Sequence, residues 1–246
     1  MTERVFGRLK SFDERSRNFP IRTFFRGLAP KTQLWACSKV LDQGNEGSCV
    51  GHGIAHELIA TPVPVPSIDH TYARMIYLEA KKVDEWPGED YEGTSVIAGL
   101  KVAKKLGWYD NFRWAFNLDD IILGVGYEGP AVMGTNWYTG MMDIDSDGFV
   151  HATGVNEGGH CWGLLGIDIQ MKAGILITSW GQSWGRVGRA FISFDGIQKL
   201  MDNSGECAFV IGRHDISVPV PPEPEPEDDE GCMGKVSRLM NLIRVR

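Results

Sequence analysis

The sequence predicts an α+β protein in which helices come first and an antiparallel sheet follows. Two observations support this class. Up to about residue 125 apolar residues recur at helical spacing between capping residues, and after residue 128 they fall into short, glycine-bounded runs typical of strands. A chain of 246 residues can bury a sizeable core. We therefore expect two segregated lobes, with a functional site in the cleft between them.

Three helices are predicted in the first half, at residues 49–60, 68–83 and 96–107. The first ends at the proline-rich stretch 61–66. Ser67 is the expected N-cap of the second helix and Ser95 that of the third, because short hydroxyl side chains accept from free amides at a helix start. Gly107 is the expected stop of the third helix.

The second half predicts the strands of an antiparallel, barrel-like sheet. The apolar stretch 119–134 is interrupted by Gly and Pro, and we expect a turn followed by a strand there. The predicted strands are residues 130–137, 159–169, 173–180, 188–194 and 207–212.

Composition excludes several classes of function. The formal net charge of −7 disfavours nucleic-acid binding. No run of about 18 apolar residues predicts a transmembrane segment, and the polar start lacks the features of a classical signal peptide. Five cysteines without a CxxC pair favour neither a disulfide scaffold nor a structural zinc site. The expected location is therefore a reducing compartment, cytoplasmic or virion-associated. Residues 143–150 are interpreted as an acidic turn rather than a calcium loop.

The two ends of the chain differ from the domain predicted at residues 31–218. Residues 1–30 are rich in arginine and predict a strap over the domain surface or, alternatively, a segment that covers a cleft or binds a partner. Residues 219–231 form an acidic, proline-rich linker. Residues 232–246 are basic and amphipathic, which favours a docking peptide for a protein partner over a membrane-surface helix.

The stretch "DQGNEGSCVGHG" (residues 42–53) places a lone cysteine behind flexible backbone at the start of a predicted helix. A helix N-terminus lowers the pKa of a thiol, which makes Cys49 a candidate nucleophile. The preceding glycines let a substrate carbonyl approach the backbone. The side-chain amide of Gln43 and the backbone N–H of Cys49 can together form a two-donor oxyanion hole.

Three sequence blocks resemble those of the papain-like cysteine peptidases. They are "QGNEGSCVG", "GGHCWGLLGID" and "TSWGQSWGRVGRAFIS", and they occur in the order of that family within residues 35–212. The resemblance implies a two-lobed papain-like fold, with a helical lobe to about residue 125 and a barrel-like β lobe after it. It also implies a thiol peptidase that acts on peptides or proteins and needs no metal or cofactor.

The resemblance further implies roles for individual residues. Cys49 would be the nucleophile, His160 the general base and acid that pairs with it as imidazolium with thiolate, and Gln43 a donor of the oxyanion hole. Thr178 stands where the family has the Asn that orients the histidine. The residues implied to border the substrate are Gly93, Thr94, Cys161 and Trp180.

Departures from the family pattern define the alternatives. Glu46 stands where secreted relatives carry a bridging cysteine, which agrees with a reducing compartment. The short stretch before Gln43 resembles compact bacterial or phage members without a propeptide domain, so the arginine-rich segment or a partner would have to control activity. Because Thr178 replaces Asn, a weakly active or non-catalytic module of the same fold, docked to an assembly such as a phage virion, is the alternative. An amidase acting on cell-wall peptides would use the same thiol and imidazole.

Overall fold

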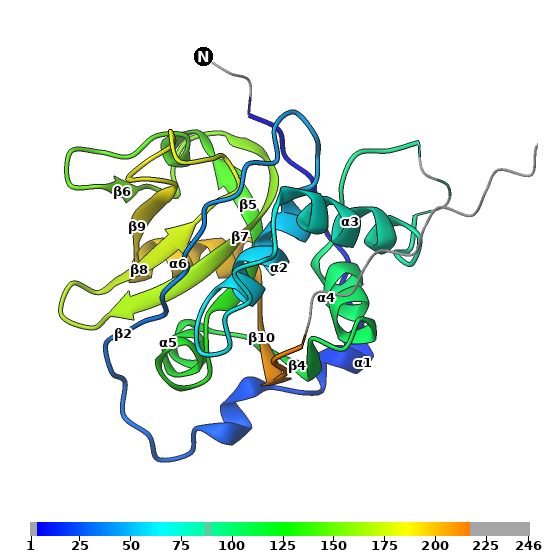
Figure 1. Cartoon of the computed structure of the whole chain (residues 1–246). Helices are drawn as coiled ribbons and strands as arrows, with labels where there is room; N and C mark the ends of the chain where they lie inside the picture. The colour runs from blue at the N-terminus through cyan, green and yellow to red at the C-terminus, as the bar shows by residue number, and fades with distance from the viewer. Residues whose placement is uncertain (1–3, 87, 89, 217–246) are drawn as a thin grey trace, which may run out of the picture.

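The computed structural model describes residues 4–86, 88 and 90–216, and in this part six α-helices pack on an eight-stranded sheet (Figure 1). The predictions for residues 219–231 and 232–246 lie outside the described residues. The helices are α1 (Glu14–Arg17), α2 (Cys49–Ile59), α3 (His70–Lys81), α4 (Val96–Lys105), α5 (Leu118–Tyr127) and α6 (Phe194–Asp202). The strands are β1 (Arg8–Leu9), β2 (Gln33–Leu34), β3 (Thr94–Ser95), β4 (Tyr109–Ala115), β5 (Ala131–Tyr138), β6 (Phe149–Val150), β7 (Asn156–Asp168), β8 (Ala173–Ile177), β9 (Arg189–Ser193) and β10 (Glu206–Arg213).

The large sheet is mostly antiparallel and open. Its order is β4-β10-β5-β7-β8-β9-β6, with β2 beside β7, and only the β6–β9 pair among its described pairs is parallel. The predicted α+β class and all five predicted strands are confirmed. The sheet is not closed into a barrel, because β4 and β6 end it without pairing with each other.

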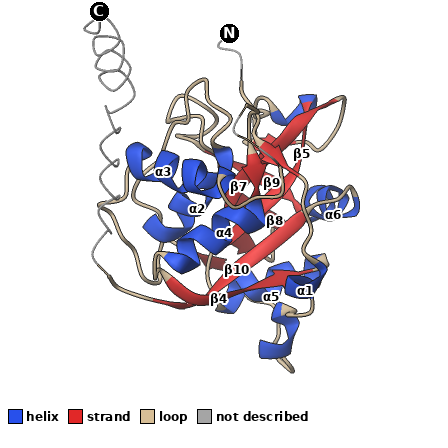
Figure 2. Cartoon of the chain, turned by 90° about the vertical axis from the view of Figure 1, so that its right-hand side faces the viewer, coloured by secondary structure: helices blue, strands red, loops and turns tan. Residues whose placement is uncertain are grey.

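Helices cover both faces of this sheet. Figures 1 and 2 show α2, α3 and α4 grouped together, with α2 next to the sheet. Every residue of α2 is buried, because α3 and α4 cover the side that the sheet leaves free. Its Glu57 pairs with Arg213 of β10 at 2.7 Å, which ties the helix to the sheet through an almost fully buried ion pair. None of the helices in the described part of the chain is long and apolar enough to span a bilayer.

A side chain caps the start of each described α-helix except α2, whose N-cap Ser48 makes no such hydrogen bond. Ser95 caps α4 as predicted, since its hydroxyl accepts from the amide of Ala98. At α3 the prediction of Ser67 is wrong. Asp69 caps this helix by accepting from the amide of Tyr72 at 3.0 Å, because a carboxylate closer to the first turn reaches the free amides.

Two elements differ from the sequence predictions. In the stretch 119–134 the predicted strand is β5, but the predicted turn is wrong: residues 119–127 belong to α5, which Asn117 caps by accepting from the amide of Asp120. The glycines of α5 do not break it, since Phe209 fills the space beside Gly124, where a Cβ would lie 2.4 Å from the ring. The mostly helical first half also contains β4, which pairs with β10 from the end of the domain.

Candidate active site

The N-terminal segment lies against the predicted catalytic residues. Strand β1 pairs in parallel with β3. Gly7, just before β1, donates from its amide to the carbonyl of Gly159 at 3.2 Å, and its own carbonyl accepts from the amide of Thr94 at 2.9 Å. Cys49 and His160 are completely buried. Of the two interpretations of residues 1–30, this geometry places residues 6–8 over the candidate site.

Residues 6–8 lie on a surface formed by glycines, and we call this surface the peptide channel. Its glycines are Gly47, Gly93, Gly158 and Gly159. A Cβ on Gly159 would lie 2.0 Å from the carbonyl oxygen of Arg8, and one on Gly93 would lie 2.4 Å from that of Gly7. Gly93 also has a φ of 94°, which L side chains rarely adopt. Because side chains are absent here, an extended backbone can approach the walls closely.

Cys49 is the first residue of α2, as predicted. Its sulfur accepts from the amide of Cys161 at 3.4 Å, so the thiol lies beside the backbone of β7 next to His160. Burial raises the pKa of the Cys49 thiol to about 11, and hydrogen bonds from the amides of Cys161 and Gly7 offset only part of this. The expectation of a lowered pKa is therefore wrong for this covered state, because desolvation outweighs the helix N-terminus.

His160 lies in β7 with an aromatic ring on each of two sides. Trp180 stacks on it at a centroid distance of 4.7 Å, and Trp137 meets it edge-on at 4.9 Å. The Nε2 atom is 2.7 Å from the hydroxyl oxygen of Thr178, and Nδ1 has no hydrogen-bond partner among the described residues. Burial lowers the pKa of His160 to about 3, so the ring is neutral in this state.

Thr178 therefore lies within hydrogen-bond distance of the ring of His160. Its hydroxyl can either donate to a ring nitrogen or accept from it, so this hydrogen bond allows both neutral tautomers of His160. The imidazolium form carries N–H on both nitrogens, and Thr178 then acts as an acceptor. The contact leaves Nδ1 as the ring nitrogen available to a thiol or a leaving group.

The side chain of Gln43 is held in one orientation. The hydroxyl of Ser179 donates to its Oε1 at 2.5 Å, which identifies Nε2 as the other end of the amide. Nε2 donates to the carbonyl of Glu46 at 2.8 Å and to the carbonyl of Val5 at 3.2 Å. A peptide carbonyl of the N-terminal segment thus accepts from the donor predicted for the oxyanion hole.

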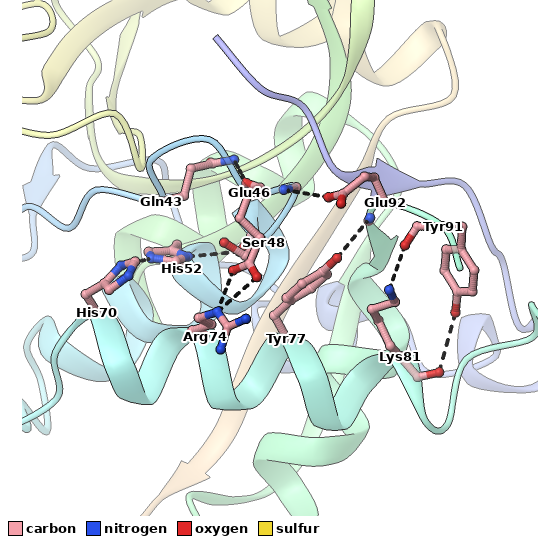
Figure 3. Close-up of polar contacts among 12 residues, drawn as sticks. Gln43, Glu46, Ser48, His52, His70, Arg74, Tyr77, Lys81, Tyr91 and Glu92 are labelled. Atoms are coloured by element: carbon pink, nitrogen blue, oxygen red, sulfur yellow. Dashed lines mark hydrogen bonds and ion pairs between the residues drawn. The ribbon is translucent and has the colours of Figure 1, made fainter. Parts of the chain in front are cut away.

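The loop before Cys49 is fixed by side chains from α3 and from the segment before β3 (Figure 3). Arg74 contacts both carboxylate oxygens of Glu46 at 2.9 and 3.0 Å, and the carboxylate of Glu92 accepts from the amide of Gly47 at 3.0 Å. His52 is 2.9 Å from the carbonyl of Ser48. The ion pair between Glu46 and Arg74 thus connects the loop to α3.

The residues predicted to border the substrate lie around this site. The backbones of Gly93 and Thr94 line the path of Gly7, and Trp180 stacks on His160. The thiol of Cys161 packs toward α2, where a Cβ on Gly53 would lie 2.7 Å from its sulfur. Backbone surfaces rather than side chains therefore form most of the channel.

Comparisons with known proteins bear on this arrangement. No protein-family model matches the sequence, and no similar sequence is found among curated proteins. Solved structures do match. Xylellain, a cysteine protease from Xylella fastidiosa, aligns with a TM-score of 0.64 at 17% identity, covering 87% of this chain and 99% of its own.

Two further structures agree. Procathepsin L 3 of the Tenebrio molitor larval midgut aligns with a TM-score of 0.53 at 13% identity, covering 76% of this chain and 72% of its own. The recombinant stem bromelain precursor gives 0.51 at 14% identity, covering 87% and 78%. This chain has the papain-like fold. Because the sequence identities are low, the likeness to these structures concerns the fold alone.

The papain-like fold brings together residues that sequence reasoning missed. Trp137 was assigned to a strand but not to the site. On β5, Trp137 follows Thr135 by two residues, and Thr135 pairs with His160 of β7. Because residues two apart on a strand face the same side, strand alternation could have placed Trp137 at the site. Arg8 and Glu206 form a fully buried ion pair at 2.7 Å. A lone glutamate in an otherwise apolar strand was the available signal for a buried cationic partner.

The described part of this papain-like chain contains no ready set of metal ligands. Within residues 4–86, 88 and 90–216, no group of three or more His, Cys, Asp or Glu side chains is placed to hold an ion. The acidic turn at residues 143–150 is instead closed by Asp145. Its carboxylate accepts from the amides of Asp147 and Phe149, both at 2.9 Å, and contacts His151.

Proposed function

We propose that this protein is a cysteine peptidase that hydrolyses peptide bonds, and that its N-terminal segment keeps it latent. One observation carries the proposal. The peptide channel holds an extended polypeptide beside the thiol of Cys49 through hydrogen bonds to the main chain of Gly7. Recognition through main-chain groups does not depend on side chains, so the same surface can accept other peptides.

The residues around the channel support a thiol mechanism. The sulfur of Cys49 attacks the carbonyl carbon of the substrate while His160 takes the thiol proton. The side-chain amide of Gln43 and the Cys49 N–H stabilise the resulting oxyanion. Collapse of this intermediate breaks the C–N bond, and His160 returns the proton to the leaving amine. Water, deprotonated by His160, then hydrolyses the thioester and regenerates the thiol.

The N-terminal segment also holds the site in an unreactive form. At the sulfur of Cys49 the segment presents the amide of Gly7, whose hydrogen bond lowers the pKa of the thiol but does not offset its burial. Covering the site also desolvates it, which raises the pKa of Cys49 and lowers that of His160. Both residues are then neutral, and the nucleophile is a thiol instead of a thiolate.

The experiment is labelling with a peptidyl epoxide directed at thiols, followed by peptide mapping. Full-length protein and a Gly7→Ala variant are compared, with Cys49→Ser and His160→Ala added to the Gly7→Ala background as controls. We expect an adduct at Cys49 in Gly7→Ala that depends on His160. An absence of adduct at Cys49 in Gly7→Ala, with the variant folded, would refute the proposal.

A non-catalytic papain-fold module is the second candidate, and one observation favours it. Nδ1 of His160 has no hydrogen-bond partner within the described residues, and Thr178 does not restrict the ring to one tautomer. A module of this kind would bind extended peptides in the channel without turnover. Peptide binding to the Gly7→Ala protein without labelling or hydrolysis, also after Thr178→Asn, would favour it.

A further inference from the structure

Two histidines form a hydrogen-bonded chain that ends at the peptide unit before the candidate nucleophile (Figure 3). Nδ1 of His52 lies 2.9 Å from the carbonyl oxygen of Ser48, and Nε2 of the same ring lies 2.9 Å from Nδ1 of His70. His52 is completely buried in α2, whereas His70 begins α3 and is exposed. The Ser48 carbonyl and the amide of Cys49 belong to one peptide unit, so the chain connects the protein surface with a group of the candidate site.

The hydrogen-bond partners define which ring nitrogens carry hydrogen. A carbonyl oxygen only accepts, so Nδ1 of His52 donates to Ser48. Burial lowers the pKa of His52 to about 4, which keeps the ring neutral in neutral solution and leaves its Nε2 as an acceptor. Nδ1 of His70 is therefore the donor to that nitrogen. Both hydrogen bonds run in the same direction, from the surface toward the Ser48 carbonyl.

Two donors fix the direction of the Ser48 carbonyl. The amide of His52 donates to it at 3.2 Å, in addition to the ring. The peptide bond between Ser48 and Cys49 is trans and planar, so the N–H of Cys49 points away from this carbonyl. The same N–H makes a hydrogen bond to the Cys49 sulfur, which places it on the side of the thiol. The orientation of the carbonyl therefore determines where the predicted oxyanion donor points.

Packing alone does not require an imidazole at this position. A buried imidazole is costly unless its nitrogens are paired, whereas an apolar side chain would fill the same volume without that cost. If the peptide unit rotated, the N–H of Cys49 would leave the oxyanion hole and the carbonyl oxygen of Ser48 would turn toward it. A carbonyl oxygen repels developing negative charge, so such a rotation would remove one of the two donors and add a repulsive group.

We propose that His52 is a positioning residue that holds the Ser48–Cys49 peptide unit with its N–H directed into the oxyanion hole, and that His70 fixes the tautomer this requires; the proposal rests on the proposed peptidase function. His52 acts through the backbone and contacts neither the sulfur nor the substrate. Its contribution is therefore confined to reactions in which an oxyanion forms.

The test compares two reactions of the same thiol in the full-length Gly7→Ala protein. Acyl transfer from N-acetylglycine p-nitrophenyl ester forms a thioester at Cys49 through an oxyanion and releases p-nitrophenolate. Alkylation by iodoacetamide displaces iodide without an oxyanion. His52→Leu removes both ring nitrogens but keeps a branched, buried side chain, and His52→Asn retains an N–H donor near the position of Nδ1. Glu57→Gln is the matched control, because Glu57 is also buried in α2 but pairs with Arg213.

We expect His52→Leu to lower the acylation rate by about 10- to 100-fold, less than the roughly 100- to 1000-fold cost of losing an oxyanion donor outright. Alkylation should stay unchanged, and His52→Asn should restore acylation. Glu57→Gln should keep the ratio of the two rates even where it lowers stability. An unchanged acylation rate in His52→Leu, or an equal loss of both reactions, would overturn the positioning role alone. If the Gly7→Ala protein itself is not acylated at Cys49, the peptidase proposal fails and the positioning role fails with it.

A second measurement observes the peptide unit directly and does not depend on turnover. Ser48–Cys49 is the only Ser–Cys pair in the sequence, so serine labelled with ¹³C at the carbonyl and cysteine labelled with ¹⁵N give one NMR correlation from this unit. His70→Ala is included because this exposed position can change without a cost to folding. Without His70, Nε2 of His52 can take the proton, and Nδ1 then presents a lone pair to the Ser48 carbonyl.

The correlation should shift in His70→Ala and in His52→Leu, and it should return toward its original position in His52→Asn. A shift confined to the His52 variants would overturn the part assigned to His70. A correlation that stays in place in His70→Ala and in every folded His52 variant would overturn the whole proposal, whatever the activity of the protein.

Discussion

Replacing Gly7 by alanine should release the N-terminal segment and activate the thiol of Cys49. A Cβ on Gly7 would lie 1.8 Å from the carbonyl oxygen of Gly47 and 2.3 Å from its carbonyl carbon. These atoms belong to backbone that is fixed in the loop before α2, so the methyl group cannot be accommodated without moving the segment. The substitution leaves the residues of the predicted mechanism unchanged.

The expected magnitude follows from the pKa of the thiol. Burial places it at about 11, compared with 9.0 for an ordinary cysteine, so at pH 7.5 the covered thiol has about 100-fold less thiolate than an ordinary one. Uncovering should therefore raise the rate of alkylation by at least about 100-fold, and further if His160 stabilises the thiolate. Because a raised pKa favours the neutral thiol, reactivity of the covered form should keep rising with pH up to about 11, whereas Gly7→Ala should reach its plateau at lower pH.

The assay is a time course of iodoacetamide labelling, with the adduct at Cys49 quantified by peptide mapping because Cys37 is also partly accessible. Gly126→Ala is the matched control. It adds the same methyl group in α5, where the nearest atoms, of Lys31, would be 3.6 Å away. Equal labelling rates and equal pH profiles for Gly7→Ala and the unmodified protein, with both folded, would refute the argument that the segment covers the thiol.

Two further outcomes are expected. In the Gly7→Ala background, Thr178→Val should lower kcat by about 10- to 100-fold, part of what a positioned general base contributes, while Thr178→Asn should maintain or raise it. A kcat unchanged by Thr178→Val, measured with a fluorogenic peptide, would show that this hydroxyl does not orient His160. Separately, Glu57→Ala should reduce the free energy of unfolding by about 3–5 kcal/mol, because it leaves the guanidinium of Arg213 buried with less compensation. Urea denaturation measures this, and a loss below about 1 kcal/mol would contradict it.

Much of the secondary structure and the position of the candidate nucleophile could be predicted because they depend on local chemistry. Ser95 caps a helix by reaching an amide three residues later, and Cys49 begins a helix directly after a glycine-rich loop. The strands around His160 are apolar runs bounded by glycine. For α5 the same reasoning failed, since the packing of Phe209 against Gly124 compensates for the low helix propensity of glycine.

By itself, the sequence determined the class of the fold and the pattern of cysteine, histidine and glutamine blocks, since these are set by neighbours in the chain. The tertiary structure alone decided what surrounds them. Arg8 meets Glu206 across 198 residues, and the carbonyl of Val5 accepts from Gln43 across 38. Burial then reverses the pKa shift that the helix start suggests for Cys49. Contacts at such separations and the exclusion of water have no local signature in a sequence, and they determine whether this site is open or closed.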